Sequence, residues 1–285
     1  MAWIAVVTAA TGINDSHISA VAGELPTTAV LNRLAPNAVE FQVEAAAIPK
    51  ISDIPGIDIN VLPTSNRRKS LLIADMDSTI IPVECIDELA DFAGVKAEVA
   101  SVTEAAMRGE LDFGQALDTR VALLKGITRA QIEECRQRRV SLNPGADILV
   151  KTMNSLGAFT ALVSGGFTVF TNPIAAKAGF QLNRANTLLF DGEELSGKVA
   201  EPICDADTKL RTLNEIINDR GISSDDVIAV GDGANDAPMV AKAGLGVAFH
   251  AKPKLKEVAK ARLDHSDLTA LLALQGIPEA QWVSG

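Results

Sequence analysis

The sequence predicts an α/β protein: a Rossmann-like parallel sheet with an inserted helical cap and a small N-terminal α+β domain. Three short apolar runs, at residues 71–74, 158–163 and 227–230, have the length and composition of strands buried on both faces of a sheet. Between the first two runs, residues 84–140 show apolar positions at helical spacing. A polar segment at residues 63–70 separates this part of the chain from the N-terminal region.

Composition narrows the class of protein. The chain has 285 residues and is 47% hydrophobic, which is enough for one large domain or two of unequal size. Its net charge of −10 and its 4% of aromatic residues disfavour a nucleic-acid partner. No apolar stretch is long enough to cross a membrane, and the start lacks the basic region of a signal peptide. Three scattered cysteines suit a reducing cytosol, so we expect a cytoplasmic protein.

Histidine is too scarce for several kinds of hydrolase. The only histidines stand at positions 17, 250 and 265, away from any acidic cluster. A zinc hydrolase, a Ser-His-Asp triad and a phosphohistidine mechanism therefore all lack the residues that they need.

The N-terminal region is predicted to be an α+β unit without catalytic residues. Expected strands cover residues 3–8, 29–31, 39–43 and 57–62, and a helix capped at residues 14–16 covers residues 17–25. The segment 63–70, with its basic residues 67–69, is predicted to be a solvated linker.

Two carboxylates follow the first buried run. Asp75 and Asp77 stand two residues apart at the end of the predicted strand, where open α/β sheets bind ligands. Two carboxylates this close repel each other unless a cation or a shared proton intervenes. The alternative is a solvated acidic turn. The helical segment that follows, with helices expected at 86–92, 96–107, 113–124 and 129–139, is longer than one crossover needs and predicts a lid over the strand ends.

Polar groups also follow the later strands. A helix is expected over 146–156, and the strand 158–163 ends in Ser164-Gly165-Gly166, whose small residues let backbone N–H groups approach an anion. It is not a nucleophile elbow, because Leu162 stands where that motif needs glycine. The alternative is a plain turn. A hairpin is expected around residues 192–197.

Lys209 and the last acidic loop complete the pattern. Asp207 or Thr208 is predicted to cap a helix running to residue 218. Lys209 in its first turn opposes the helix dipole, which leaves two alternatives, a functional role elsewhere and a surface lysine. The strand 227–230 ends in the acidic loop 231–236, which is not a dinucleotide fingerprint, since Asp236 replaces its third glycine. A strand at 244–249 and a mostly helical segment at 255–274 follow.

Together these groups predict phosphoryl transfer. Oxygen ligands without histidine or cysteine select Mg²⁺, which prefers phosphate-bearing partners. A carboxylate can be the nucleophile, forming an aspartyl-phosphate, while a second acid protonates the leaving alcohol.

The motifs resemble, in order, the four motifs of the haloacid-dehalogenase-like phosphatases. They are Asp75-Met-Asp-Ser-Thr79, Ser164-Gly-Gly, Lys209 and Gly231-Asp-Gly-Ala-Asn-Asp236. Within this family the chain is similar, over about residues 70–275, to members that act on phosphoserine. That likeness depends on the cap, on Pro82-Val-Glu84-Cys and on the stretches 107–113 and 120–125. It implies an N-terminal domain at 1–66 and a phosphatase domain at 67–285, with the cap at about 84–140.

The resemblance also implies a role for each site residue. Asp75 is the nucleophile, Asp77 is the general acid and then the base, and Asp75, the Asp77 carbonyl and Asp232 hold Mg²⁺. The implied substrate-binding residues are Glu84, Met107, Phe113, Arg120, Ser164, Gly165, Lys209 and Asn235. Glu84 and Arg120 would take the ammonium and the carboxylate of an amino acid, and such a pairing is physically sound.

The expected reaction is Mg²⁺-dependent hydrolysis of O-phospho-L-serine, the last step of the phosphorylated route to serine, with no nucleic-acid or membrane partner and with a homodimer allowed. One alternative is a relative that acts on another phosphomonoester or passes phosphate to an acceptor alcohol. Another is a non-catalytic phospho-receiver, against which Asp77 and the cap argue. Similar enzymes often carry an amino-acid-binding regulatory domain at the N-terminus, and residues 1–65 are short for one.

Overall fold

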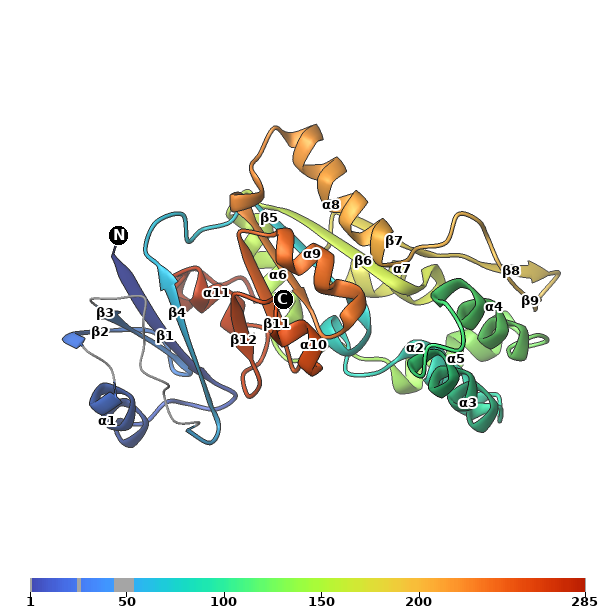
Figure 1. The fold of residues 1–285 in the computed structure, drawn as a ribbon, viewed down its shortest axis with the longest axis horizontal. Coiled ribbons are helices and arrows are strands. Elements are labelled where there is room, and N and C mark those ends of the chain that lie inside the picture. The colour runs from blue at the N-terminus through green and yellow to red at the C-terminus, as the bar shows by residue number, and fades with distance from the viewer. Residues whose placement is uncertain (1, 25–26, 44–53, 285) are drawn as a thin grey trace.

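A six-stranded parallel sheet forms the centre of the molecule (Figure 1). The computed structural model describes residues 2–24, 27–43 and 54–284. The strands of this sheet, in spatial order, are β12 (Ala261–Leu263), β11 (Leu245–Phe249), β10 (Val227–Gly231), β5 (Leu71–Ala74), β6 (Phe159–Phe167) and β7 (Leu182–Asn186). The predicted α/β class with a parallel core sheet is therefore confirmed.

The order of the strands reverses beside β5. The chain runs from β5 to β6 and β7 on one side, and then returns to place β10, β11 and β12 on the other side. Open α/β sheets bind ligands at such a switch point, outside the carboxyl ends of the strands. All four residues of β5 are buried, and the polar loops that follow β5, β6 and β10 meet at this edge.

Helices cover both faces of the sheet. On β5, Leu72 and Ala74 belong to one hydrophobic core and Leu71 and Ile73 to another, because successive side chains of a strand point to opposite faces. The first core includes residues of α6 (Ala146–Ser155), α7 (Thr168–Ala178) and α11 (Ala270–Leu274). The second includes residues of α8 (Ala206–Arg220), α9 (Ala237–Lys242) and α10 (Pro253–Lys256).

A group of four helices follows β5 and forms the cap. They are α2 (Cys85–Phe92), α3 (Lys96–Met107), α4 (Phe113–Leu123) and α5 (Arg129–Arg139), each within one residue of its predicted range. Side chains of Asp112 and Thr128 cap α4 and α5. The predicted hairpin is present as β8 (Leu188–Asp191) and β9 (Glu194–Val199). It joins the cap through the Leu195 N–H, which donates to the Ile127 carbonyl, and through the Leu195 carbonyl, which accepts from the Gly126 N–H.

The N-terminal region is a four-stranded antiparallel sheet in the order β2-β3-β1-β4. Its elements are β1 (Trp3–Ala9), α1 (Asp15–Glu24), β2 (Thr27–Ala35), β3 (Ala38–Val43) and β4 (Ile57–Pro63). The predicted end of its helix, residue 25, lies outside the described residues. Val7 packs with α1 on one face, whereas Ile4 and Val6 on the other face join the core that contains α11. The small sheet is therefore docked on the main domain by apolar burial.

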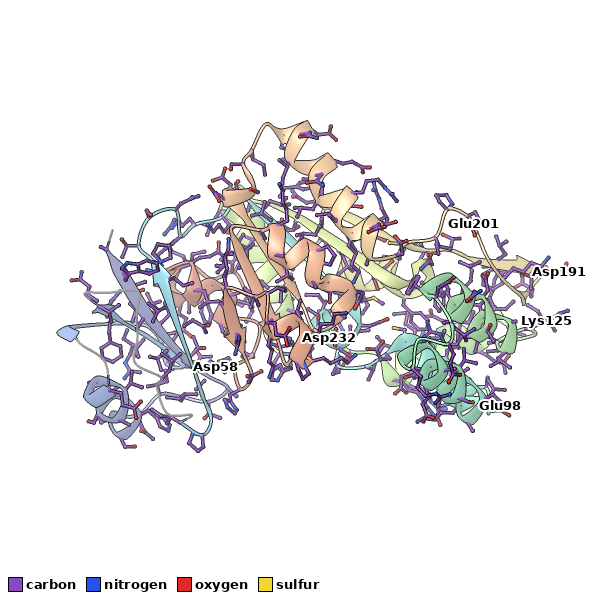
Figure 2. All side chains as sticks on the ribbon, in the orientation of Figure 1. Asp58, Glu98, Lys125, Asp191, Glu201 and Asp232 are labelled. Atoms are coloured by element: carbon purple, nitrogen blue, oxygen red, sulfur yellow. The ribbon has the colours of Figure 1, made fainter. Side chains whose placement is uncertain are left out.

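Polar contacts fix the same interface. Asp58 of β4 accepts hydrogen bonds from the backbone N–H groups of Asp264, His265 and Ser266, at 2.7 to 3.3 Å, in the loop after β12 (Figure 2 labels Asp58). Asn60 pairs through both side-chain atoms with the backbone of Arg262. These bonds satisfy backbone groups at the open edge of the main sheet.

Three predictions about local structure are wrong, the first of them in part. The segment 63–70 is mostly exposed, as a linker should be, but its basic cluster is not simply solvated, because Arg67 forms a 2.9 Å ion pair with Glu40 and donates to the Leu274 carbonyl. Residues 255–274 are not mostly helical, because β12 pairs with β11 between the short helices α10 and α11. Helix α8 is capped by Asp205, which accepts from the Thr208 N–H at 2.8 Å, and not by Asp207 or Thr208.

In the described part of the chain, no helix has the length and the apolar character needed to cross a membrane.

Candidate active site

Asp75 stands at the carboxyl end of β5 with one carboxylate oxygen already fixed. Its backbone N–H donates to the Val230 carbonyl of β10, and its Oδ1 accepts from the Met76 N–H at 2.7 Å. Its Oδ2 lies 2.7 Å from Lys209 Nζ. The side chain is buried, and burial together with the nearby Asp236 raises the pKa of Asp75 above its usual value, although Lys209 opposes this shift.

Lys209 is a fully buried lysine held between two carboxylates. Its Nζ lies 2.7 Å from Asp75 Oδ2 and 2.7 Å from Asp236 Oδ1. Burial disfavours the ammonium, but the attraction of Asp236 and Asp75 outweighs it and raises the pKa of Lys209. Lys209 is therefore a charged group of the site and not a surface lysine.

Asp236 shapes the loop that follows β10. Its Oδ2 accepts from the backbone N–H groups of Asp232 and Gly233, both at 3.1 Å. A Cβ on Gly231 would lie 2.3 Å from the same oxygen, so this position requires glycine. Asn235 is exposed and lies with its Nδ2 at 3.5 Å from Asp75 Oδ2.

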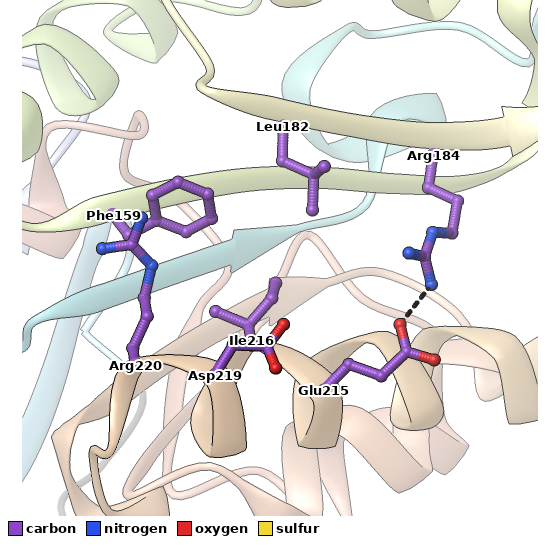
Figure 3. A pocket seen from close by; sticks show the side chains of 7 residues that line it. All are labelled: Phe159, Leu182, Arg184, Glu215, Ile216, Asp219 and Arg220. Atoms are coloured by element: carbon purple, nitrogen blue, oxygen red, sulfur yellow. Dashed lines mark hydrogen bonds and ion pairs between the residues drawn. The ribbon is translucent and has the colours of Figure 1, made fainter.

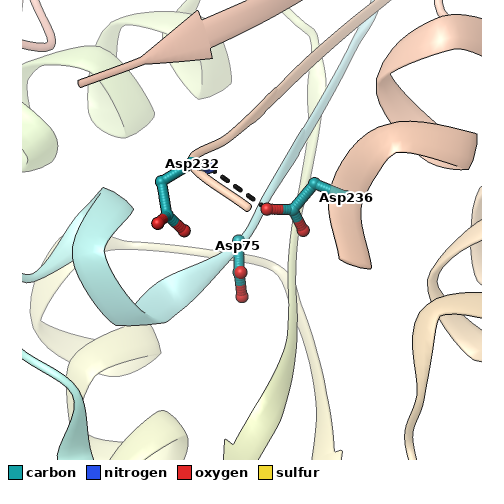
Figure 4. A group of neighbouring side chains, drawn as sticks. All are labelled: Asp75, Asp232 and Asp236. Atoms are coloured by element: carbon teal, nitrogen blue, oxygen red, sulfur yellow. Dashed lines mark hydrogen bonds between the residues drawn. The ribbon is translucent and has the colours of Figure 1, made fainter. Parts of the chain in front are cut away.

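Three carboxylates gather at this switch point. Oxygens of Asp75, Asp232 and Asp236 all lie within 4.8 Å of one another (Figure 4). Burial raises the pKa of Asp232 to about 6, although Lys252 opposes the shift. A cluster of carboxylate oxygens with this charge fits a divalent cation. The predicted ligand set contained Asp77 and not Asp236, whose side chain is already bonded to Lys209 and to two N–H groups.

Asp77 lies in the turn after β5, and, besides burial, its charge contributes to the raised pKa of Asp75. Its Oδ1 is buried and has no hydrogen-bond partner among the described residues. Burial, with a contribution from Glu84, raises the pKa of Asp77 to about 7. A Cβ on Gly166 would lie 2.9 Å from Asp77 Oδ2, so the absent side chain makes room for this carboxylate.

Ser78 and Glu84 connect this turn to the cap. Ser78 has a φ of 55°, in the left-handed region, and its Oγ donates to Glu84 Oε1 at 2.7 Å. The sequence did not reveal the contact of Ser78 with Glu84, or the bonds of Asp236 to Lys209 and to the N–H groups of its own loop. Both Ser78 and Asp236 nevertheless stand inside the motifs described above.

The loop at Ser164 lies between the core and the cap. Ser164 is buried, and its Oγ accepts from the Gly166 N–H at 2.9 Å. A Cβ on Gly165 would lie 3.5 Å from the ring of Phe113, at the start of α4, so this cap residue covers the loop. The structure thus brings Phe113 to the carboxyl ends of the strands.

Arg120 lies on α4 near two acidic side chains of the cap. Its Nε donates to the Ala116 carbonyl of its own helix at 3.1 Å. Burial lowers the pKa of Arg120, and the attraction of Asp87 and Glu84 opposes this shift. The remaining expected substrate contact, the side chain of Met107, lies outside the described part of the structure.

A separate groove lies away from these residues. It has a volume of about 590 Å³ between α8 and strands β6 and β7 (Figure 3). Its arginines are already engaged: Arg184 pairs with Glu215 at 2.7 Å, and Arg220 stacks 3.5 Å from the ring of Phe159. None of the predicted site residues lines it.

The site combines a fixed buried carboxylate, a buried ammonium, a second acid that titrates near neutral pH, and a glycine-rich loop. Such a set suits attack on phosphorus and protonation of a leaving oxygen. A family model for haloacid dehalogenase-like hydrolases matches residues 69–244, more than half of the chain. The chain therefore belongs to the haloacid dehalogenase-like hydrolases.

Relatives of known kind indicate which haloacid dehalogenase-like hydrolases the chain resembles. A phosphoserine phosphatase from Polaromonas sp. is 45% identical over 227 residues, which cover 77% of this chain and 96% of the relative. A phosphoserine phosphatase from Mycobacterium tuberculosis is 37% identical over 278 residues, which cover 96% of this chain and 67% of the relative.

Solved structures agree with this grouping. A phospho-aspartyl intermediate analogue of phosphoserine phosphatase is 40% identical with a TM-score of 0.66, and the match covers 72% of this chain and 98% of that one. A probable phosphoserine phosphatase from Vibrio cholerae is 30% identical with a TM-score of 0.81, covering 98% of this chain and 88% of that one.

Proposed function

We propose that the chain hydrolyses O-phospho-L-serine to L-serine and phosphate through an aspartyl-phosphate on Asp75. The observation that carries this proposal is the buried pair of Asp75 Oδ2 and Lys209 Nζ at 2.7 Å. Because the Met76 N–H holds Oδ1, Oδ2 is the oxygen assigned to attack phosphorus, and Lys209, which pairs with Oδ2, lies where the charge of a transferring phosphoryl group would develop.

Asp77 is the proposed general acid. With a pKa of about 7 it is about half protonated at neutral pH and largely protonated below it, and its buried Oδ1 has no hydrogen-bond partner among the described residues. It gives its proton to the serine oxygen as the P–O bond breaks, and the resulting carboxylate then takes a proton from the water that attacks the aspartyl-phosphate. Ser164 and the backbone of Gly165 hold the phosphoryl oxygens, with Asn235 beside them.

Mg²⁺ is the proposed cation of the acidic cluster. The residues present fit it, because the cluster offers carboxylate oxygens and neither histidine nor cysteine. We assign Asp75, Asp232 and the Asp77 carbonyl as its ligands and leave Asp236 to anchor Lys209. When bound, Mg²⁺ supplies positive charge to the phosphoryl oxygens.

Residues of the cap are proposed to bind the amino-acid part of the substrate. Glu84, oriented by Ser78, would bind the ammonium, and Arg120 would bind the carboxylate. The Phe113 ring and Met107 would cover the substrate from the cap. The neighbourhood of Arg120 and the acids Glu84 and Asp87 supports this assignment, because a substrate ammonium and carboxylate need groups of both signs.

A phospho-receiver is the weaker candidate. It would need neither Asp77 nor a cap, and both are present beside Asp75 in the described structure. A phosphatase for another small phosphomonoester differs from our proposal only in the cap contacts. We also propose a cytoplasmic location, which is supported by three buried cysteines without a disulfide.

Phosphate release with a substrate panel tests the function. Phosphoserine should have the highest kcat/KM, above phosphothreonine, phosphoethanolamine, phosphoglycolate and a sugar phosphate, with p-nitrophenyl phosphate as a generic substrate. A higher kcat/KM for any of the non-amino-acid esters would reject phosphoserine as the substrate while keeping the phosphatase. Phosphorylated protein without turnover of any ester would support the receiver.

A further inference from the structure

Asn186, at the end of β7, is a buried amide with no role in the chemistry proposed above. Its side chain is 1% exposed and makes three hydrogen bonds. Nδ2 donates to the Gly165 carbonyl at 2.8 Å and to the Cys204 carbonyl at 3.2 Å, and Oδ1 accepts from the Cys204 N–H at 2.7 Å. Both N–H groups and the oxygen of the amide therefore form hydrogen bonds, and these bonds join two segments that are distant in sequence, at Gly165 and at Cys204.

The contact with Gly165 replaces a hydrogen bond that is missing where the pairing of β6 with β7 is interrupted. Strands β6 and β7 pair at Val163 with Arg184 and again at Phe167 with Asn186, so residues 164–166 bulge out of the ladder opposite residue 185 alone. The half-buried Gly165 carbonyl in this bulge has no backbone partner on the neighbouring strand and needs another donor. Asn186 Nδ2 provides that donor.

The same contact sets the direction of the next peptide group. In a trans peptide the carbonyl of Gly165 and the N–H of Gly166 point in opposite directions. With the carbonyl held by Asn186, the N–H donates to Ser164 Oγ at 2.9 Å. A hydroxyl that accepts this bond keeps its own proton for another acceptor, and hydrogen bonds in a chain polarise one another.

The contact with Cys204 links Asn186 to the helix that carries Lys209, the other proposed phosphate-binding residue. Cys204 is buried and directly precedes Asp205, the residue that caps α8. Lys209 stands in the first turn of that helix, and its N–H donates to the Asp205 carbonyl. One amide thus holds the loop of Ser164 and the start of the helix of Lys209 in a fixed relation.

We propose that Asn186 is the positioning residue of the phosphate-binding site, which it serves by fixing the Gly165–Gly166 peptide and the start of α8. The proposal rests on the proposed function only in that Ser164, Gly165 and Lys209 bind a phosphoryl group. It makes no use of the rest of the substrate. Losing Asn186 should therefore weaken every phosphate-bearing ligand alike.

Two variants and one matched control test this proposal. Asn186→Ala removes all three bonds, whereas Asn186→Asp keeps the size and the acceptor for Cys204 but replaces the Nδ2 donor. The control is Asn183→Ala, on the same strand, whose Oδ1 accepts from Thr171 of α7 at 2.9 Å and touches neither loop. For each folded protein, in buffer that contains Mg²⁺, we would measure the affinity for inorganic phosphate by calorimetry, and kcat/KM for phosphoserine and p-nitrophenyl phosphate.

We expect both Asn186 variants to bind phosphate about 10- to 100-fold more weakly, and to lose kcat/KM by the same factor on both esters, because misplacing a binding group has effects of this size. Asn183→Ala should keep wild-type phosphate affinity even if its melting temperature falls. A folded Asn186→Asp with phosphate affinity within twofold of wild type would overturn the proposal. A wild type that binds phosphate but does not turn over phosphoserine would reject the proposed function alone.

A measurement on the wild type avoids folding defects. In the presence of Mg²⁺, titration with inorganic phosphate should shift the side-chain amide NMR signals of Asn186 and leave those of Asn183 unchanged. If the Asn186 signals do not move at saturating phosphate, the coupling between this amide and the phosphate site is absent and the proposal is wrong.

Discussion

Lys209 Nζ lies 2.7 Å from Asp75 Oδ2, and both side chains are almost completely buried. An unpaired charge in such a place would be strongly destabilising, so each group depends on the other and on Asp236. The arrangement places a cation directly against the carboxyl group at the end of β5, where neither group is exposed to water. A phosphoryl group that approaches Asp75 would meet an ammonium already in place, which is the preorganised charge that catalysis requires.

Replacing Asp77 by asparagine should lower kcat for phosphoserine by about 10²–10⁴-fold, because the amide cannot protonate the leaving serine oxygen. For p-nitrophenyl phosphate, whose leaving group needs little protonation, the loss should be much smaller. Steady-state kinetics on both esters measure this difference. The exposed Asp207→Asn serves as the control for a lost surface charge. Equal losses on both esters would contradict the acid role.

Replacing Arg120 by alanine should lower kcat/KM for phosphoserine about 10- to 100-fold, the size expected for a charge-assisted contact. Phosphoethanolamine lacks a carboxylate and should be turned over as poorly as by the wild type. Arg138→Ala is the matched control, since Arg138 is an exposed arginine on cap helix α5.

The outcome that excludes carboxylate recognition is a loss of the same factor on phosphoserine and phosphoethanolamine. Glu84→Gln supplies the complementary comparison: it should affect phosphoserine more than phosphoglycolate, which has no ammonium.

Removing divalent cations should abolish turnover, because the carboxylates of the acidic cluster would then repel the phosphate dianion. Adding Mg²⁺ to the chelated enzyme should restore activity. Adding Ca²⁺ should not, because its larger and looser coordination does not hold phosphate in line for attack. Phosphate release after dialysis against chelator measures all three states. Full activity in excess chelator would show that the reaction needs no metal.

Replacing Asp58 by alanine should destabilise the protein by about 2–3 kcal/mol, because it leaves the buried N–H of Ser266 and the part-buried N–H groups of Asp264 and His265 without their acceptor. Chemical denaturation measures the change, with the exposed Asp118→Ala as the control, which should alter stability by less than about 0.5 kcal/mol. An Asp58 variant as stable as the wild type would mean that the N-terminal sheet does not stabilise the loop after β12.

Local patterns were sufficient to predict much of the fold. The apolar runs that became β5 and β10 are buried on every residue, so the sequence signal and the structural environment agree. The cap helices were predicted within one residue because glycines separate them and because α4 and α5 have capping boxes. The acidic loops were correctly expected at one edge, since carboxyl ends of parallel strands meet there.

The errors come from contacts between distant residues. Strand β12 has only three residues and exists because it pairs with β11, which no local pattern reveals. Arg67 looked solvated because its partner Glu40 lies 27 positions earlier in the chain. Asn186 stands outside every motif, and only the register shift opposite Ser164–Gly166 shows why an amide is needed there.

The central claim is that Asp75 carries the phosphoryl group during turnover, and acid quenching in the steady state tests it most directly. Enzyme mixed with excess phosphoserine and Mg²⁺, quenched within milliseconds and digested, should yield the peptide containing Asp75 with one added phosphoryl group. Borohydride reduction of that acyl phosphate should convert Asp75 to homoserine, and Asp75→Asn should show neither product nor turnover. Hydrolysis at the full wild-type rate by Asp75→Asn, or a phosphoryl group found only on another residue, would contradict the mechanism.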